Sequence, residues 1–416
     1  MNWNYDVNTR GNVQLSKDLN TLSVLNAIRN SSSISRSDVA RITGLTTPTI
    51  SNLVSDLIKE GFVIEMGPGE SSVGRRPIML EFNKDARYIG VIDFGRSNVI
   101  IGLTNLAGEI ITLRELDLDK EAKPEITLER IGNELKNLID EYEQNGIKVW
   151  GVGVAISGGV NGKTGVCIES YVLKWTNVPV RQILEAKVQC PVYVANNIRC
   201  MALGEKWFGA ARDEENFLAI RFGRGVGSGI IINGELFEGV RGVAGEIGHV
   251  TVEPNGPECY CGNKGCLEYY ISEGSIFERL EKLMEEGDKN AERLLQESKD
   301  KPRGKKLGLI ARSAEEGDEL SRLIIDDLVH YLGLAIANLV KAFNPSIVIL
   351  LTEDKFVRES VSREIQAVVD PLLEPIVSSR VNIVPGLLGS ENEIIGASTL
   401  VLDNVFKTIR IVPVRI

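Results

Sequence analysis

Apolar side chains recur every three or four residues through the first sixty positions, which is the period of an amphipathic helix. This spacing predicts helices over residues 18–30, 35–43 and 46–60. Gly44 supplies the turn before the third helix. Pro48 lies in the first turn of that helix, where its missing N–H costs no hydrogen bond. The sequence therefore predicts two helices joined by a short turn, with a further helix in front of them.

Two short apolar runs at residues 62–65 and 78–82 follow these helices and predict the strands of a hairpin. The glycine-rich segment between the strands ends in Arg75 and Arg76. A helix-turn-helix followed by a hairpin is typical of a winged DNA-binding domain, which we assign to residues 1–83. A three-helix packing module with solvated polar residues is the alternative, and the arginine pair at the hairpin favours DNA binding.

Short hydrogen-bonding side chains cover the polar face of the third helix, which would enter a major groove. The hairpin arginines are suited to a minor groove. The DNA contacts that we expect are Arg36, Thr47, Thr49, Ser51, Asn52, Arg75 and Arg76. A single recognition helix has limited affinity, so we expect a homodimer or a dimer of dimers on a pseudo-palindromic operator.

From residue 88 onward, apolar runs of strand length alternate with helical segments and glycine-rich turns. This alternation predicts an α/β body with buried mixed sheets. The predicted elements are a strand and turn over 88–97, antiparallel strands over 99–103 and 110–113, a helix over 127–144, strands over 149–156 and 217–222, and a largely helical, charged region over 273–330.

Length and composition limit the class of protein. A chain of 416 residues exceeds one ordinary core, so two or three domains are expected. We find no apolar run of about 18 residues and no basic start leading into an apolar segment, so neither a membrane span nor a secretory signal is expected. Six cysteines are too few for a disulfide scaffold of this length, which favours a reducing cytoplasm. Cys167, Cys190 and Cys200 are interpreted as core thiols.

The formal net charge of −10 would ordinarily argue against a nucleic-acid partner. Its distribution weakens that objection. Residues 1–83 carry eight lysines and arginines against eight acidic residues, whereas the remainder carries 39 against 49. The N-terminal domain is therefore neutral overall, and its basic side chains can still share one face.

One histidine and three cysteines lie close together in sequence. Nine residues separate His249 from Cys259, one separates Cys259 from Cys261, and four separate Cys261 from Cys266. One imidazole and three thiolates make a closed tetrahedral set, which suits structural Zn²⁺ better than a catalytic ion that needs an open position. Three buried free cysteines are the plain alternative, and this spacing favours the metal.

Several motifs of the body resemble those of the ROK family, which groups repressors, open reading frames and sugar kinases. They are the cysteine-rich segment and residues 175–179, 202–205 and 244–249. With the domain in front, the chain from about residue 15 to residue 406 resembles a ROK transcriptional repressor. The resemblance implies an actin-like, ribonuclease-H-like pair of domains with a sugar cleft between them. It also implies that the histidine and the three cysteines hold zinc.

The resemblance further implies which residues face a sugar and where the body divides. A donor and acceptor mix of amides, carboxylates and imidazole fixes the orientation of a polyol. Surface carboxylates beside a metal loop are the plain alternative for the two glutamates. The implied sugar contacts are Asn196, Asn197, Glu246, His249 and Glu268. We place the smaller subdomain at residues 84–206 plus 394–416 and the larger, zinc-bearing one at residues 207–393.

The chain departs from the kinases of that family at the nucleotide side. The family's Asp-x-Gly-Gly-Thr turn is here residues 93–97, with Arg96 in place of the second glycine. Arg224 replaces the threonine of the second phosphate turn, and residues 351–354 lack the adenosine-side glycine pair. The slot of the catalytic aspartate holds Asn197, whose amide cannot act as a base. A working kinase is not expected.

The sequence therefore predicts a sugar-responsive DNA-binding regulator, a repressor released from its operator by a monosaccharide or a derivative. A ROK sugar kinase that phosphorylates a hexose with ATP and carries an appended DNA-binding domain is the alternative from the enzyme class. The sequence does not distinguish an activator from a repressor, because the direction of regulation depends on where the operator lies relative to the promoter. The sequence does not name the sugar.

Overall fold

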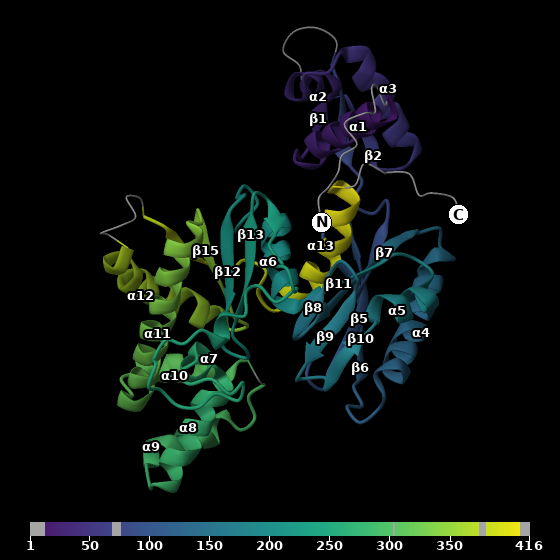
Figure 1. The fold of residues 1–416 in the computed structure, drawn as a ribbon. Helices are drawn as coiled ribbons and strands as arrows, with labels where there is room; N and C mark the ends of the chain where they lie inside the picture. Colours follow the sequence, from purple (N-terminus) through teal and green to yellow (C-terminus); the bar gives the residue numbers. More distant parts are fainter. Residues whose placement is uncertain (1–12, 69–75, 303, 374–379, 408–416) are drawn as a thin grey trace.

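The computed structural model describes residues 13–68, 76–302, 304–373 and 380–407, with the side chains of 13–15 and 407 left out (Figure 1). A small N-terminal domain, purple in Figure 1, stands above a body of two lobes. Helix α13, in yellow, lies between this domain and the seam of the lobes.

The N-terminal domain is a winged helix-turn-helix, and the predicted helices and hairpin are confirmed. Ser35 begins the second helix by accepting a hydrogen bond from the Asp38 N–H, and Gly44 ends it in the left-handed region at φ 68°. A two-residue strand, too short to leave a periodic signal, adds a third strand to the hairpin in the order β1-β3-β2. The elements are α1 (Val13–Arg29), β1 (Ile34–Ser35), α2 (Arg36–Thr43), α3 (Thr47–Lys59), β2 (Val63–Pro68) and β3 (Ile78–Phe82).

The first lobe is built on a five-stranded sheet in the order β11-β7-β4-β5-β6, with β4, β7 and β11 parallel and β4-β5-β6 antiparallel. The strands that the sequence predicted here are confirmed. A three-stranded sheet, β10-β9-β8, flanks it. The elements are β4 (Tyr88–Phe94), β5 (Asn98–Asn105), β6 (Ile110–Asp117), α4 (Pro124–Glu143), β7 (Val149–Ile156), β8 (Gly159–Asn161), β9 (Val166–Ser170), β10 (Trp175–Val178), α5 (Val180–Val188) and β11 (Val192–Asn196).

The second lobe also contains a five-stranded sheet, in the order β14-β13-β12-β15-β16, and its helices pack around one large apolar core. Its central strands β12 and β15 are parallel, as in the first lobe. The elements are β12 (Phe217–Arg221), β13 (Gly227–Ile232), β14 (Glu235–Leu236), η1 (Ile247–His249), α7 (Leu267–Ile271), α8 (Glu273–Glu285), α9 (Lys289–Ser298), α10 (Lys306–Glu315), α11 (Glu319–Phe343), β15 (Ile347–Leu351), α12 (Lys355–Leu373), β16 (Asn382–Pro385) and η2 (Gly389–Glu391).

Two helices lie between the sheets of the two lobes. Helix α6 (Asn197–Phe208) packs against β12 and β13 of the second lobe, and α13 (Asn392–Lys407) packs against β4 and β7 of the first. The two helices also pack against each other. We propose to keep the subdomain boundaries at residues 84–206 plus 394–416 and 207–393, with α6 as an element that both lobes share.

Helix α11 is the one helix in the described residues that is long and apolar enough to cross a membrane. Over half of its most apolar window, 56%, is buried inside the protein. It packs against α7, α10 and α12, so the lobe core accounts for its apolar character. The sequence alone does not mark this segment as a membrane span, because its apolar residues are interrupted by polar ones.

Candidate functional site

The histidine and three cysteines singled out by their spacing meet at one point of the second lobe. His249 ends η1, Cys266 immediately precedes α7, and Cys259 and Cys261 lie on the loop between. Their four ligand atoms all lie within 4.8 Å of one another. The Cys261 and Cys266 sulfurs are 3.7 Å apart, and the Cys259 sulfur is 3.8 Å from His249 Nδ1. The four side chains thus form one cluster.

The dimensions of this cluster fit a tetrahedral zinc site. Zn–S bonds of about 2.3 Å place two sulfurs of a tetrahedron about 3.8 Å apart. Gly262 and Gly265 have positive φ angles of 88° and 63°, which favour glycine and let the loop turn tightly between the cysteines. A side chain at Gly265 would also collide with the Glu253 carbonyl oxygen, 1.7 Å from where its Cβ would lie. The arrangement can hold a metal ion, as the spacing predicted.

His249 faces the expected sugar side with its other nitrogen. His249 Nε2 is 3.2 Å from the Tyr260 hydroxyl and 3.7 Å from Glu268 Oε2, and the Tyr260 hydroxyl donates to Glu268 Oε2 at 3.0 Å. A metal on Nδ1 leaves the proton on Nε2, where it donates to a neighbouring oxygen. Burial raises the pKa of Glu268, and the negative charge of Glu246 adds to that rise. Glu246, His249 and Glu268 therefore lie in one electrostatic neighbourhood.

The two asparagines expected beside these residues are engaged in the fold. Asn196 caps α6 by accepting from the Ile198 N–H at 2.9 Å, and its amide donates to the Gly158 carbonyl oxygen at 2.9 Å. Asn197 donates to Glu393 Oε1 at 3.2 Å. Both side chains are buried. In this structure they hold the start of α6. Of the other expected sugar contacts, His249 and Glu268 lie within hydrogen-bonding distance of the Tyr260 hydroxyl, and Glu246 is an electrostatic neighbour of Tyr260.

A partly buried ion cluster includes residues of both segments that resemble kinase phosphate turns. We call Asp93, Arg221, Arg224, Glu353 and Glu393 the ion cluster. Arg221 donates to Glu353 and to Glu393, each at 2.6 Å. Arg224 lies 3.3 Å from Glu393 Oε2 and 3.6 Å from Glu353 Oε1. The Arg221 side chain is only 5% exposed. Residues of both lobes and of α13 meet in this cluster.

The charges of the ion cluster leave no spare positive charge for a phosphate. Burial and the neighbouring Glu393 raise the pKa of Asp93 well above its usual range, although both arginines act in the opposite direction. Glu353 and Glu393 by themselves balance the charges of Arg221 and Arg224. Phosphoryl transfer requires groups that neutralise phosphate charge, and the arginines here are already neutralised. Arg96, singled out by sequence, is exposed outside this cluster.

The sequence pattern does not reveal Tyr260, Glu353 and Glu393 as site residues, because their partners lie far away along the chain or carry no local signature. The Arg221–Glu393 bond spans 172 residues. The one available signal was Arg221 itself, a charged residue in the apolar run 217–222. Buried arginines are rare without a paired carboxylate, so this residue predicts that a partner exists without naming it.

Arg199 is a further buried cation that the sequence analysis did not single out, and it contacts both lobes. It lies on α6 and is 2% exposed. Its guanidinium donates to the Ala244 carbonyl oxygen at 3.0 Å and to the Val160 carbonyl oxygen at 3.4 Å. Ala244 stands two residues before Glu246, so Arg199 positions the segment that leads into the expected sugar side.

The expected DNA contacts fall on the second and third helices and on the wing. Thr47 and Asn52 are exposed, whereas Thr49 and Ser51 are half-buried. The Thr49 hydroxyl lies 2.9 Å from that of Thr46. Arg36, the expected contact on α2, pairs with Glu65 of the wing strand β2, with Arg36 Nη2 2.6 Å from Glu65 Oε1.

The two wing arginines differ in what the structure describes. Arg76 is exposed and lies two residues before the start of β3. Arg75 lies outside the described residues.

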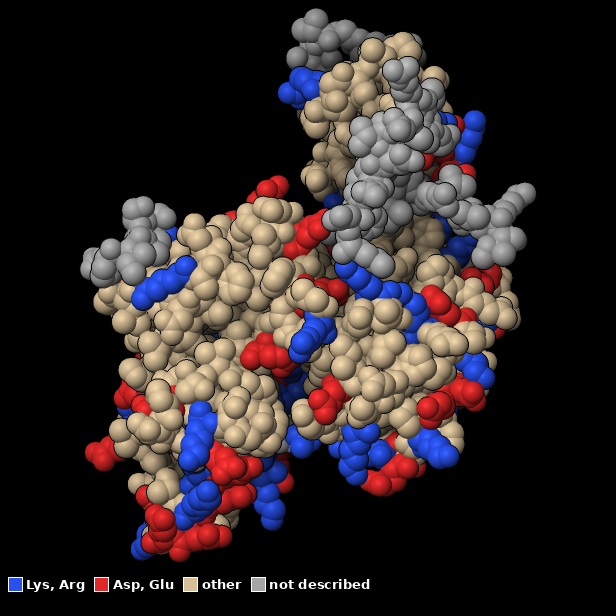
Figure 2. All heavy atoms as spheres, viewed as in Figure 1, with Lys and Arg blue, Asp and Glu red and all other residues tan. Residues whose placement is uncertain are grey.

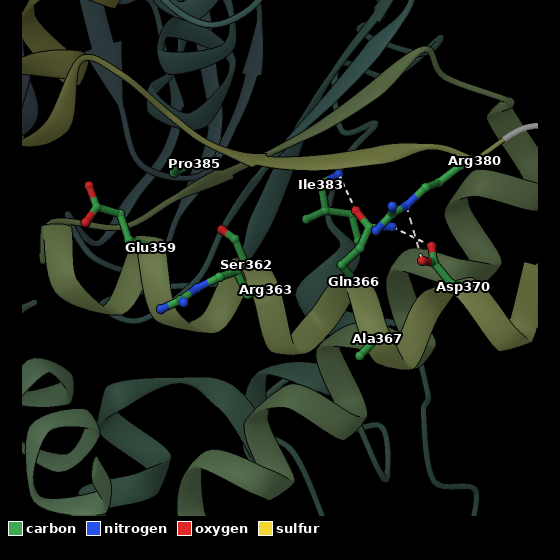
Figure 3. A pocket seen from close by; sticks show the side chains of 9 residues that line it. All are labelled: Glu359, Ser362, Arg363, Gln366, Ala367, Asp370, Arg380, Ile383 and Pro385. Atoms are coloured by element: carbon green, nitrogen blue, oxygen red, sulfur yellow. Dashed lines mark hydrogen bonds and ion pairs between the residues drawn. The ribbon is translucent and has the colours of Figure 1, made fainter. Parts of the chain in front are cut away.

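A surface pocket of about 750 Å³ lies elsewhere, between α12 and β16 (Figure 3). In it the Gln366 amide accepts from the Ile383 N–H and donates to the Val381 carbonyl oxygen, which covers backbone groups of the edge strand. Arg380 pairs with Asp370 at 3.2 Å. The lining residues all belong to the second lobe, away from the metal cluster and the ion cluster, so this pocket carries no functional argument.

Comparison with known proteins gives one family for each part of the chain. The family described as winged helix-turn-helix DNA-binding matches residues 17–64, and the ROK family matches residues 88–404. A putative xylose repressor from Caldicellulosiruptor sp. (strain Rt8B.4) is 37% identical over 361 residues, 86% of this chain and 89% of the relative. The xylose repressor of Bacillus subtilis (strain 168) is 31% identical over 390 residues, 93% of this chain and 96% of the relative.

Among solved structures, the crystal structure of a ROK family transcriptional regulator, described as a homologue of the E. coli MLC protein, superposes with a TM-score of 0.74 and 25% identity. It covers 95% of this chain and 100% of its own. Both the winged domain and the two-lobed body are included in that overlap. The chain therefore belongs to the ROK family and combines the sugar-kinase-like body of that family with an N-terminal winged helix-turn-helix.

Proposed function

We propose that this protein is a DNA-binding transcriptional repressor that a monosaccharide releases from its operator. The observation that carries the proposal is the contrast within the body. The expected sugar residues Glu246, His249 and Glu268 lie together beside a metal cluster, while a neutralised ion cluster occupies the phosphate region. A winged helix-turn-helix in front and relatives named as repressors support the same conclusion.

The effector that we propose is D-xylose or a close relative of it, because relatives named xylose repressors align along 86% to 93% of this chain at 31% to 37% identity. A relative named N-acetylglucosamine repressor aligns along 82% at 30% identity, so N-acetylglucosamine belongs in the sugar panel. We further propose that Zn²⁺ occupies the cluster of His249, Cys259, Cys261 and Cys266 and fixes the wall that carries Glu246. The zinc would have a structural role, since its ligand set is closed. The protein would act in the cytoplasm as a homodimer on a two-fold operator.

The test is a DNA-binding titration. A duplex is selected by the purified protein from a random-sequence library, and its affinity is measured by fluorescence anisotropy with and without D-xylose and a panel of other pentoses and hexoses. We expect nanomolar binding that one sugar weakens at least fivefold, the lower range of allosteric couplings. Failure to select any duplex, or affinity that no sugar changes, would overturn the proposal.

A sugar kinase with an appended DNA-binding domain is the rival function. Asn197 stands in the slot of the catalytic base, and no positive charge of the ion cluster is free for a phosphate. A coupled assay of ADP release over the same sugar panel distinguishes the two functions. We expect no turnover above the protein-free rate, and clear turnover would establish the kinase.

Replacing Arg76 with alanine is expected to weaken operator binding and to lower its salt dependence. Each phosphate contact contributes about one unit to the slope of log K against log salt, so the slope should fall by about 0.9. The measurement is anisotropy between about 50 and 200 mM salt. Arg114→Ala, which removes an exposed arginine of the first lobe, is the matched control. An unchanged slope for Arg76→Ala would exclude the wing from the DNA interface.

Replacing Tyr260 with phenylalanine is expected to tighten D-xylose binding about fivefold. The tyrosine hydroxyl bonds to His249 and Glu268, the groups proposed to bind sugar, so it competes for the same hydrogen bonds. One such bond contributes about 1 kcal/mol net. Calorimetric titration measures the affinity, with zinc content determined alongside. Tyr171→Phe, whose ring packs on that of Tyr260 with centroids 6.3 Å apart, is the control. Weaker binding by Tyr260→Phe would identify the hydroxyl as a sugar contact.

A further inference from the structure

The winged domain rests on the body through a cluster of aromatic rings and one arginine; we call Arg29, Phe62, Trp150, Trp207 and Phe406 the junction. Arg29 is the last residue of α1, and Phe62 follows α3 after a short turn. Trp150 belongs to β7, Trp207 to α6 and Phe406 to α13. The junction therefore joins α1 and the end of the recognition helix α3 to three elements of the body.

Arg29 makes the first contact of the junction. Its guanidinium carbon lies 4.4 Å from the centre of the Trp207 ring and 5.1 Å from that of the Phe406 ring. The two rings are themselves 5.6 Å apart, edge to face. Burial lowers the pKa of Arg29 to about 10. A guanidinium that is partly removed from water gains more from an aromatic face than one in solvent, so this contact is sensitive to small shifts of the rings.

Phe62 makes the second contact, directly behind the expected recognition helix. Its ring is fully buried and lies 5.1 Å from that of Trp150, which in turn lies 6.2 Å from that of Phe406. The Phe62 N–H donates to the Leu57 carbonyl oxygen, which ties the ring to the last turns of α3. A movement of Phe406 therefore reaches α1 through Arg29 and α3 through Phe62.

The two body helices that end at the junction begin at the ion cluster. Helix α6 starts with Asn197, which bonds to Glu393, and its next-to-last residue is Trp207. Helix α13 has Glu393 in its first turn and Phe406 at its far end. At 1.5 Å per residue, Asn197 and Trp207 are about 15 Å apart along α6. Glu393 and Phe406 are about 20 Å apart along α13. Figure 1 shows α13, in yellow, reaching from the seam of the lobes to the purple domain.

Helices α6 and α13 are packed tightly enough to transmit a displacement. They cross at Gly204 and Gly396, where a Cβ on Gly396 would stand 2.2 Å from the Cys200 carbonyl oxygen. Near the junction, Trp207 Nε1 donates to Asp403 Oδ1 at 3.4 Å. A backbone-to-backbone crossing leaves no flexible side chains to absorb movement, so the pair responds to a change at the ion cluster as one unit.

We propose that the junction is the element through which effector binding changes operator affinity, with Arg29 as its central positioning residue. This inference rests on the proposed function. A sugar that draws the lobes together would shift the ion cluster, which joins both lobes, and the paired helices would carry the shift to Arg29 and Phe62. The orientation of the winged domain would change, and with it the separation of recognition helices in a dimer. If the junction only held the domain in place, changing it would leave the effect of the sugar on operator affinity unaltered.

The experiment compares operator affinity with and without saturating D-xylose in wild type and in Arg29→Met, which keeps the length of the side chain and removes the guanidinium. The DNA is the duplex selected by the wild-type protein. The xylose affinity of each protein is measured separately by calorimetry. The response is the ratio of operator affinity without D-xylose to operator affinity with it. We expect this ratio to be at least fivefold smaller, and closer to 1, in Arg29→Met than in wild type. The xylose affinity should stay within twofold of wild type.

Arg312→Met is the matched control, because Arg312 also stacks on an aromatic ring, Phe356 at 5.5 Å, but within the second lobe. It should keep the wild-type ratio. Trp207→Phe retains an aromatic ring and should give a ratio between those of wild type and Arg29→Met. It is the test variant to use if Arg29→Met is unstable. By reciprocity, wild-type protein should bind xylose more weakly on the duplex, by the same factor.

Two outcomes are distinguishable. A wild-type ratio of 1 for every sugar contradicts the proposed function, and the inference with it. A wild-type response that Arg29→Met and Trp207→Phe both retain in full overturns the junction alone.

Discussion

Replacing Glu393 with alanine is expected to destabilise the protein by about 3 kcal/mol. Removing one partner of a buried ion pair leaves the other charge uncompensated, at a cost of about 3–5 kcal/mol. Arg221 is 5% exposed and bonds to Glu393 at 2.6 Å. Its second bond, to Glu353, is retained, which places the loss at the lower end of that range. Urea denaturation followed by circular dichroism measures the free energy of unfolding.

A double-mutant cycle separates the buried charge from the lost packing. Arg221→Met together with Glu393→Ala removes both charges, so the combined loss should be smaller than the sum of the two single losses. Glu391→Ala, on an exposed side chain two residues away, is the control and should change stability by less than about 0.5 kcal/mol. Equal effects of Glu391→Ala and Glu393→Ala would contradict the role of the ion cluster.

Replacing Cys261 with serine is expected to lower zinc content and stability together. If affinity falls a hundredfold, mass action removes about 2.7 kcal/mol of the stability that the metal contributes. His249 should also lose its orientation, so D-xylose binding should weaken in the same variant. Elemental analysis gives the zinc content, and thermal unfolding with and without EDTA gives the metal-dependent part of the stability.

The control for this prediction is Cys190→Ser, since Cys190 is a half-buried thiol of the first lobe outside the metal cluster. EDTA should lower the unfolding temperature of wild type and of Cys190→Ser but should have little further effect on Cys261→Ser. A Cys261→Ser protein that retains a full equivalent of zinc and the wild-type unfolding temperature would show that Cys261 is no ligand.

The rival kinase function depends on the same region as the first prediction. By the resemblance to ROK kinases, Asn197 and the ion cluster correspond to positions where a kinase would need a base and free cations. Red and blue side chains line the seam between the two lobes in Figure 2, so charge is plentiful there. Within the ion cluster, Arg221 and Arg224 are both paired with glutamates, which leaves neither free for a phosphate.

The sequence by itself determined the features whose physical cause is local. Helical periodicity and turn residues predicted the winged domain, and the spacing of three cysteines and one histidine, all within eighteen residues, predicted the metal cluster. Both depend on neighbours in the chain, whose geometry is set by backbone conformation. The identity of residues in known motifs likewise showed which half of a kinase site was altered.

Only the tertiary structure decided which distant residues meet. The Arg221–Glu393 bond, the stacking of Arg29 on Trp207 and Phe406, and the sharing of α6 between the lobes join segments more than a hundred residues apart. Tyr260 was hidden for another reason, since a residue between two cysteines shows no preferred direction until the loop is folded. Composition and periodicity report burial but not partners. The contacts that would link the sugar to the DNA therefore depend on how the finished lobes pack.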